Sequence, residues 1–167
     1  MNVDYWWKHP VGTRWVFEAD FANARGPAKR LAEFSVADDE GGKILIKYDI
    51  FNPPDPGATA SFDHIWHEQD GHVIWASGDQ EPFWRVFKLG SKKGDIWSGP
   101  PGVGTVTHLG VEEVTVPAGT FSAVHVRITK AEDEKTHDFW FAPKEGLLQW
   151  DTRSPEGSAH LALRTYS

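Results

Sequence analysis

Residues 62–77 read FDHIWHEQDGHVIWAS, and this stretch has the pattern of a β-hairpin. Asp70-Gly71 is a preferred dipeptide for a two-residue type I′ turn, because both turn positions need a positive φ. With these two residues in the loop, Trp66 pairs with Trp75 across the two strands. The two indoles then share one face, and we expect this bulky aromatic pair to line the concave side of the sheet.

The same alternation of apolar and polar residues, with a period of two, extends over most of the chain and indicates β-strands. Residues 52–57 contain three prolines, which cannot donate to a strand ladder, so we expect an exposed loop there. Residues 90–104 are rich in Gly and Pro and are also expected to be mostly loop. The pattern predicts an all-β fold in a single domain spanning residues 1–167, with little helix. About ten antiparallel strands would form a curved, open or half-closed barrel. Besides the two in the hairpin, the predicted strands are residues 14–21, 31–36, 43–51, 81–89, 105–116, 121–130, 137–142, 147–152 and 159–166, and a short segment at 95–97 lies within the expected loop.

The composition narrows the class of protein. The 167 residues are 25% charged and 40% hydrophobic, with a net charge of −7 and no cysteine. This balance is typical of a globular domain, and the negative charge disfavours a general nucleic-acid binder, which needs Lys and Arg to neutralise phosphates. The lack of Cys excludes a disulfide scaffold, a thiolate nucleophile and metal centres built on Cys.

Neither a transmembrane segment nor a signal peptide is apparent in the sequence. No apolar run reaches the roughly 18–20 residues that span a bilayer. The first residues lack the charged and apolar regions of a secretory leader. From these residues alone we expect either a cytosolic protein or a mature domain whose leader has been removed.

Two segments in the second half of the chain carry a resemblance to a known class of proteins. Residues 114–126 read VTVPAGTFSAVHV and residues 139–148 read FWFAPKEGLL, accompanied by Gly-x-x-Trp corners at Gly12–Trp15 and Gly94–Trp97. Together they resemble bacterial exported β-domains that often occur as lipoproteins or secreted proteins. The sheet of that class resembles the half-barrel of the periplasmic lipoprotein carriers, which hold an acyl chain against a concave sheet. The resemblance implies this fold and a periplasmic, outer-membrane-associated or secreted location, and it supplies no catalytic residues.

Two strands are apolar on both faces. Phe83-Trp84 and Phe139-Trp140-Phe141 are continuous aromatic runs, and adjacent strand residues point to opposite sides of a sheet. Such strands need a second cover, which could be the loops at residues 52–60 and 99–104, an apolar ligand or another subunit. The sequence leaves the oligomeric state open. The candidate ligand-binding residues are Trp66, Trp75, Phe83, Trp84 and Trp140.

Eight histidines raise the question of a metal site. In the predicted hairpin register, His67 and His72 are the local pair that shares a face. A third ligand would have to come from elsewhere, such as His9, His108 or His160. The His-Glu-x-x-His spacing of zinc proteases is absent. We therefore expect no metal and no cofactor, with His67 and His72 as ordinary surface residues.

Three functions remain after these considerations. The first is a non-catalytic exported protein that binds an apolar or lipid-like molecule on the concave face of its sheet. The second is a carbohydrate-binding module, which would stack sugars on exposed Trp side chains. The third is a small β-barrel hydrolase or cyclase, which would need a buried acid or His with a shifted pKa in its cavity. The sequence has no Gly-x-Ser-x-Gly motif, and we expect a protein that is not an enzyme.

Overall fold

The computed structural model describes residues 1–24, 26–52, 55–77, 80–99, 104–130 and 134–167, with side chains outside 52–60 and 80–83. The predicted all-β fold is confirmed: these residues form twelve strands and no helix. None of them belongs to a helix with the length and apolar character needed to span a bilayer. The strands are β1 (Arg14–Asn23), β2 (Gly26–Glu40), β3 (Lys43–Asn52), β4 (Asp55–Gln69), β5 (His72–Ser77), β6 (Gln80–Lys88), β7 (Ile96–Ser98), β8 (Thr105–Val116), β9 (Gly119–Lys130), β10 (Lys135–Ala142), β11 (Gly146–Ser154) and β12 (Gly157–Tyr166).

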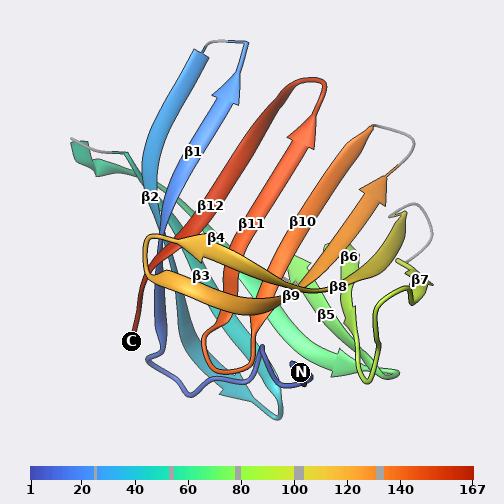
Figure 1. Ribbon diagram of the computed structural model, residues 1–167. Helices are drawn as coiled ribbons and strands as arrows, with labels where there is room; N and C mark the ends of the chain where they lie inside the picture. Colours follow the sequence, from blue (N-terminus) through green and yellow to red (C-terminus); the bar gives the residue numbers. More distant parts are fainter. Residues whose placement is uncertain (25, 53–54, 78–79, 100–103, 131–133) are drawn as a thin grey trace.

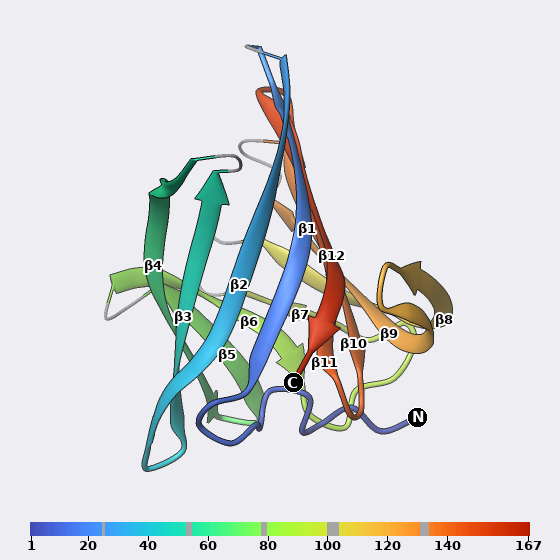
Figure 2. The same ribbon diagram turned by 90° about the vertical axis from the view of Figure 1, so that its left-hand side faces the viewer.

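The strands form one antiparallel sheet that curves into a nearly closed barrel (Figures 1 and 2). The order is β6-β5-β4-β3-β2-β1-β12-β11-β10-β9-β8-β7, so the first and last strands of the chain pair in the middle of the sheet. The barrel has one seam, between β6 and β7. Across it, the indole N–H of Trp97 donates to the backbone oxygen of Arg85 at 2.8 Å.

The hairpin at residues 62–77 has the predicted register. Trp66 pairs with Trp75, and the turn residues Asp70 and Gly71 have φ values of 52° and 74°. Positive φ at both positions is what a type I′ turn requires. The local sequence therefore determines this register, and both indoles point into the barrel, where they are 0% and 2% exposed.

The predicted loop at residues 52–57 was wrong in its second half, because β4 begins at Asp55. Residues 53–54 lie outside the described residues. The N-terminal part of β4 pairs with β3, whereas the pairing of β4 with β5 starts only at His64. Residues 55–63 therefore act as an edge strand, where a proline such as Pro56 needs no ladder donor on its free side.

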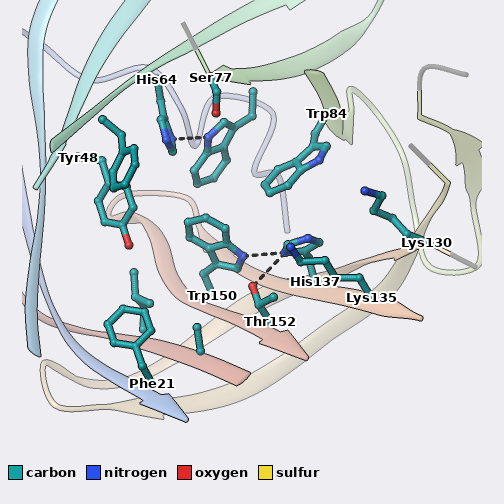
Figure 3. A pocket seen from close by; sticks show the side chains of 14 residues that line it. Phe21, Tyr48, His64, Ser77, Trp84, Lys130, Lys135, His137, Trp150 and Thr152 are labelled. Atoms are coloured by element: carbon teal, nitrogen blue, oxygen red, sulfur yellow. Dashed lines mark hydrogen bonds between the residues drawn. The ribbon is translucent and has the colours of Figure 1, made fainter. Parts of the chain in front are cut away.

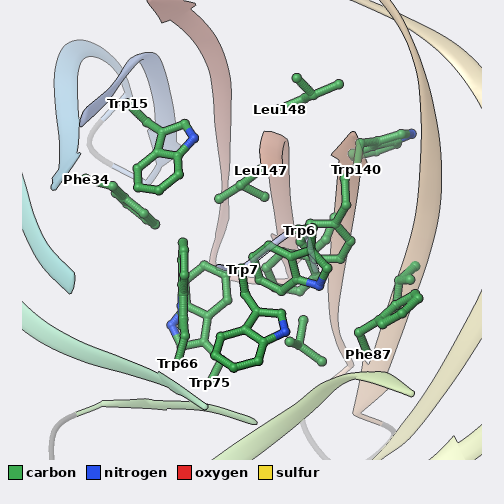
Figure 4. Packing of buried hydrophobic residues seen from close by; sticks show 14 of the residues in the cluster. Trp6, Trp7, Trp15, Phe34, Trp66, Trp75, Phe87, Trp140, Leu147 and Leu148 are labelled. Atoms are coloured by element: carbon green, nitrogen blue, oxygen red, sulfur yellow. The ribbon is translucent and has the colours of Figure 1, made fainter. Parts of the chain in front are cut away.

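The N-terminal segment, residues 1–13, crosses one end of the barrel, which we call the lower end (Figures 1 and 2). Trp6 of this segment is fully buried. Its ring stacks on Phe141 at 3.9 Å between centroids and meets Trp66 edge-on at 5.1 Å. Trp15 lies 5.8 Å from Trp66 (Figure 4), and these four rings form what we call the lower cluster.

Gly146, at the start of β11, makes room for this segment. Its φ is +78°, and a Cβ there would lie 2.6 Å from the backbone oxygen of Trp6 and 2.9 Å from Nε2 of His9. His9 is itself held in place, because its Nε2 bonds to the Trp6 oxygen at 2.8 Å and its Nδ1 to the Tyr166 hydroxyl at 3.2 Å. The lower end is thus closed by close packing of backbone and rings.

The β8–β9 hairpin bends over the outer face of β10, β11 and β12 (Figure 1). Its tip is fixed by a hydrogen bond from the Ala118 N–H to the Leu163 oxygen at 2.9 Å. Under the hairpin, Trp140 stacks on His125 at 4.2 Å and donates from its indole N–H to Glu112 at 2.5 Å. The outer face of β10 is therefore covered by a hairpin of the same sheet, where the sequence suggested loops, a ligand or a subunit.

Candidate functional site

A cavity of about 530 Å³ occupies the upper half of the barrel interior (Figure 3). It is partly open to solvent near the upper strand ends, since Phe21 lies close to the end of β1 and Ala159 close to the start of β12. Its volume is within the range of small-molecule sites. The lining residues are mainly aromatic or aliphatic: Phe21, Tyr48, Phe62, His64, Trp75, Ser77, Trp84, Lys130, Lys135, His137, Trp150, Thr152, Ala159 and Leu161.

Two histidines on opposite walls accept hydrogen bonds from tryptophans. The Trp75 indole N–H donates to Nδ1 of His64 at 2.7 Å, and the Trp150 indole N–H donates to Nδ1 of His137 at 3.3 Å. His137 also contacts the Thr152 hydroxyl at 3.0 Å. Figure 3 shows both pairs at the cavity wall. These bonds fix the aromatic walls, because each indole has a polar partner and each imidazole a preferred orientation.

Burial disfavours the charged forms of His64 and Tyr48 at the cavity wall. It lowers the pKa of His64 to about 4, against a smaller opposing effect of the Asp63 charge. Burial also raises the pKa of Tyr48 to about 12. The inner wall therefore presents neutral hydrogen-bonding groups in an apolar setting.

Positively charged side chains lie instead at the upper ends of β9 and β10. Lys130 and Lys135 are paired across the two strands, and both line the cavity. Each also takes part in other interactions. The described lining residues include no carboxylate, so an acid pair for glycoside hydrolysis is not present among them.

The structure separates the five residues that the sequence suggested for ligand binding. Trp75 and Trp84 line the cavity. Trp66 belongs to the lower cluster, and Trp140 lies on the outer face beneath the β8–β9 hairpin. Phe83 lies in β6, and its side chain is outside the described residues.

Sequence reasoning missed the histidine–tryptophan pairs. The signal for one of them was in the hairpin register, which places His64 opposite Ser77 and so diagonal to Trp75 on the same face. The partner of Trp150 could not be found in this way. His137 pairs with Thr152, and the side of the sheet on which both lie depends on the barrel's curvature.

His67 and His72 lie on the outer face of the β4–β5 hairpin. The Nδ1 atom of His72 is 2.9 Å from the Asp70 oxygen, and that of His67 is 3.4 Å from the Glu68 oxygen. Among the described residues, no group of three or more His, Cys, Asp or Glu side chains is arranged to hold a metal ion.

A second polar cluster lies on the outer face, where the sequence suggested no site. His125 lies 2.6 Å from Asp138 and 3.0 Å from Glu112, and Arg127 donates to Asp138 at 2.8 Å. Burial raises the pKa of Asp138, but the hydrogen bonds from His125 and Arg127 outweigh it and hold that pKa below its usual value. We call these four residues the outer cluster, and it ties β8, β9 and β10 together.

Comparison with known proteins reveals a shared fold. No protein-family model matches the sequence, and no curated protein matches it. A presumed lipoprotein from Parabacteroides distasonis superposes with a TM-score of 0.61 and 14% identity, over 100% of both chains. A presumed exported protein of YmcC-like fold from Bacteroides fragilis gives a TM-score of 0.60 and 14% identity, over 95% of this chain and 97% of the other. At this identity the likeness shows the fold alone.

A third structure is a presumed outer-membrane lipoprotein-sorting protein domain from Vibrio parahaemolyticus. It has 10% identity over 94% of this chain and 85% of the other, with a TM-score of 0.36. That score is too low to support an argument.

Proposed function

We propose that this protein is an exported, non-catalytic binding protein that holds an apolar or lipid-like molecule in the upper cavity. The observation that carries the proposal is the contrast within one barrel: the lower end is filled by the N-terminal segment, while about 530 Å³ of aromatic-lined space stays open above it. Concave, mostly apolar cavities with few polar groups are the usual form of small-molecule sites. The similar fold of the two exported or lipoprotein relatives supports a periplasmic, outer-membrane-associated or secreted location.

The two alternative functions fit the cavity less well. All nine tryptophans lie in the described ranges and none is exposed, so the flat surface platform of a carbohydrate-binding module is missing. A hydrolase or cyclase would need a base in the cavity. His64 has a lowered pKa, but its Nδ1 already accepts the Trp75 N–H and cannot also take a substrate proton.

Binding of the neutral dye N-phenyl-1-naphthylamine tests this proposal, because tryptophans around the cavity can transfer excitation energy to it. Ala159 lines the cavity, whereas its neighbour Ser158 is exposed on the other face of β12. We expect Ala159→Phe to fill the site and weaken dye binding by about tenfold or more, and Ser158→Phe to leave it unchanged. Equal dye binding by the two variants would contradict the proposal. Native mass spectrometry of protein from its natural host would identify the retained molecule.

A further inference from the structure

His64 differs from two other buried histidines, His9 and His125, in which both ring nitrogens have a partner. His125 contacts Glu112 through Nδ1 and Asp138 through Nε2. His9 uses both ring nitrogens, with Nε2 on the Trp6 oxygen and Nδ1 on the Tyr166 hydroxyl. His64 is 7% exposed and uses only Nδ1, as the acceptor for the Trp75 indole. An indole nitrogen can only donate, so the proton of a neutral His64 ring must reside on Nε2.

The Nε2–H of His64 has no acceptor among the described residues. Aromatic side chains lie around the His64 ring, with ring centroids 5.5 Å away for Tyr48, 6.2 Å for Phe34 and 5.6 Å for Trp75. Nε2 of His64 is not among the fully buried side-chain atoms that lack a partner, so it is reachable from the cavity, and its hydrogen-bonding capacity is available to a molecule there. Because His64 lines the upper cavity, an acceptor for this donor can be supplied by a bound molecule.

We propose, building on the function above, that His64 is the polar anchor of the upper cavity and donates from Nε2 to an uncharged oxygen of an otherwise apolar ligand. The acceptor of choice is the carbonyl oxygen of an ester or amide attached to a long alkyl chain. A carboxylate fits this position less well, because the positive charges among the described lining residues are those of Lys130 and Lys135, at the upper ends of β9 and β10. Beside His64 a carboxylate would lose its hydration without gaining a counter-charge.

The test compares three ligands of equal chain length at neutral pH: methyl dodecanoate, dodecane and dodecanoate. Each displaces N-phenyl-1-naphthylamine from the wild-type protein. We expect the ester to bind about threefold to tenfold more tightly than the alkane, the factor that one net hydrogen bond provides, and more tightly than the carboxylate.

The variants separate the hydrogen bond from the shape of the site. His64→Phe alone would leave the Trp75 indole without an acceptor, so the informative variant is His64→Phe combined with Trp75→Phe. In this double variant the ester and the alkane should bind equally. Trp75→Phe alone should weaken both ligands while keeping the preference for the ester. His72→Phe, on the outer face of the hairpin, is the matched control and should also keep the preference.

A direct measurement needs no variant. In ¹⁵N-edited NMR spectra of the wild-type protein, the Nε2–H proton of His64 should move downfield when methyl dodecanoate binds and stay in place with dodecane. Equal affinity for ester and alkane would overturn the role of His64 while leaving an apolar cavity. Tightest binding of the carboxylate would overturn the choice of an uncharged acceptor. Failure of the dye and all three ligands to bind would instead overturn the proposed function.

Discussion

The lower cluster and the upper cavity are both lined largely by aromatic side chains, but the lower cluster is closely packed and the upper cavity encloses open space. In the lower cluster, Trp6 and Trp66 pack against Phe141 and Trp15, and their indole nitrogens have no hydrogen-bond partner among the described residues. In the upper cavity, the indole nitrogens of Trp75 and Trp150 donate to histidines. Trp6 and Trp66 are therefore held by packing alone, whereas Trp15 at the edge of the lower cluster donates to the Glu145 oxygen and Trp75 and Trp150 are held by bonds to histidines.

This difference indicates separate tasks for the two halves. Close packing of rings stabilises a core but leaves no space for another molecule. Hydrogen bonds to His64 and His137 can hold ring planes in place beside an open space, where packing from one side is missing. We infer that the lower cluster contributes mainly stability and the upper cavity mainly binding.

The largest expected effect follows from truncating one ring in each half. Trp66→Ala should reduce the free energy of unfolding by about 3–5 kcal/mol, because Trp66 is fully buried and closely surrounded. Trp84→Ala, at the partly exposed wall of the upper cavity, should cost clearly less and weaken binding of N-phenyl-1-naphthylamine. Urea unfolding and dye titration measure the two effects. If Trp84→Ala proves as destabilising as Trp66→Ala, the division between the halves is wrong.

A smaller effect is expected from Asp138 in the outer cluster. Asp138→Asn should cost about 1.5–3 kcal/mol, the range for hydrogen bonds to a charged group, and should leave dye binding unchanged. Because the folded-state pKa of Asp138 is lowered, its stabilisation is present above the ordinary Asp pKa and is lost as the pH falls through the lowered value. Unfolding curves of both proteins from pH 7 to acid measure this. Their stability difference should shrink in acid, and a constant difference would contradict the assigned role.

The closure of the lower end is tested at Gly146. Gly146→Ala should cost more than the roughly 1–2 kcal/mol of a left-handed conformation alone, because the added Cβ meets the Trp6 oxygen and His9. The matched control is Gly41→Ala, which has a φ of +62° and no neighbouring atom within 4 Å of the added Cβ. Differential scanning calorimetry should rank Gly146→Ala below Gly41→Ala in melting temperature. The reverse order would show that the N-terminal segment is loosely held.

The smallest effect is expected at the pair His67 and His72, outside both halves. Replacing both by Ala should change the free energy of unfolding by less than about 1 kcal/mol, as at most surface positions. Added zinc should leave the melting temperatures of the wild-type protein and of the double variant unchanged. A zinc-dependent rise in melting temperature that disappears in the double variant would establish a metal site that we do not expect.

The sequence by itself determined the features that depend on near neighbours. The Asp70-Gly71 turn fixed the register of Trp66 and Trp75, because a two-residue loop allows one alignment and the period of two assigns each side chain to a face. The same period predicted an all-β barrel and most of its strands. It gave two of the cavity's aromatic residues, Trp75 and Trp84, since these lie in clearly patterned strands.

Tertiary structure alone decided which end of the barrel is closed and which faces of the strands are inside. The lower end is closed by contacts between residues far apart in the chain, such as the Trp15 indole with the Glu145 oxygen and Tyr166 with His9. Trp140 lies between the inward-pointing rings of Phe139 and Phe141 and so points outward, where the bent β8–β9 hairpin covers it. The alternating pattern predicts that neighbouring residues of a strand point to opposite faces of the sheet. The curvature of the whole sheet decides which face lies inside the barrel, and no local sequence pattern encodes that curvature.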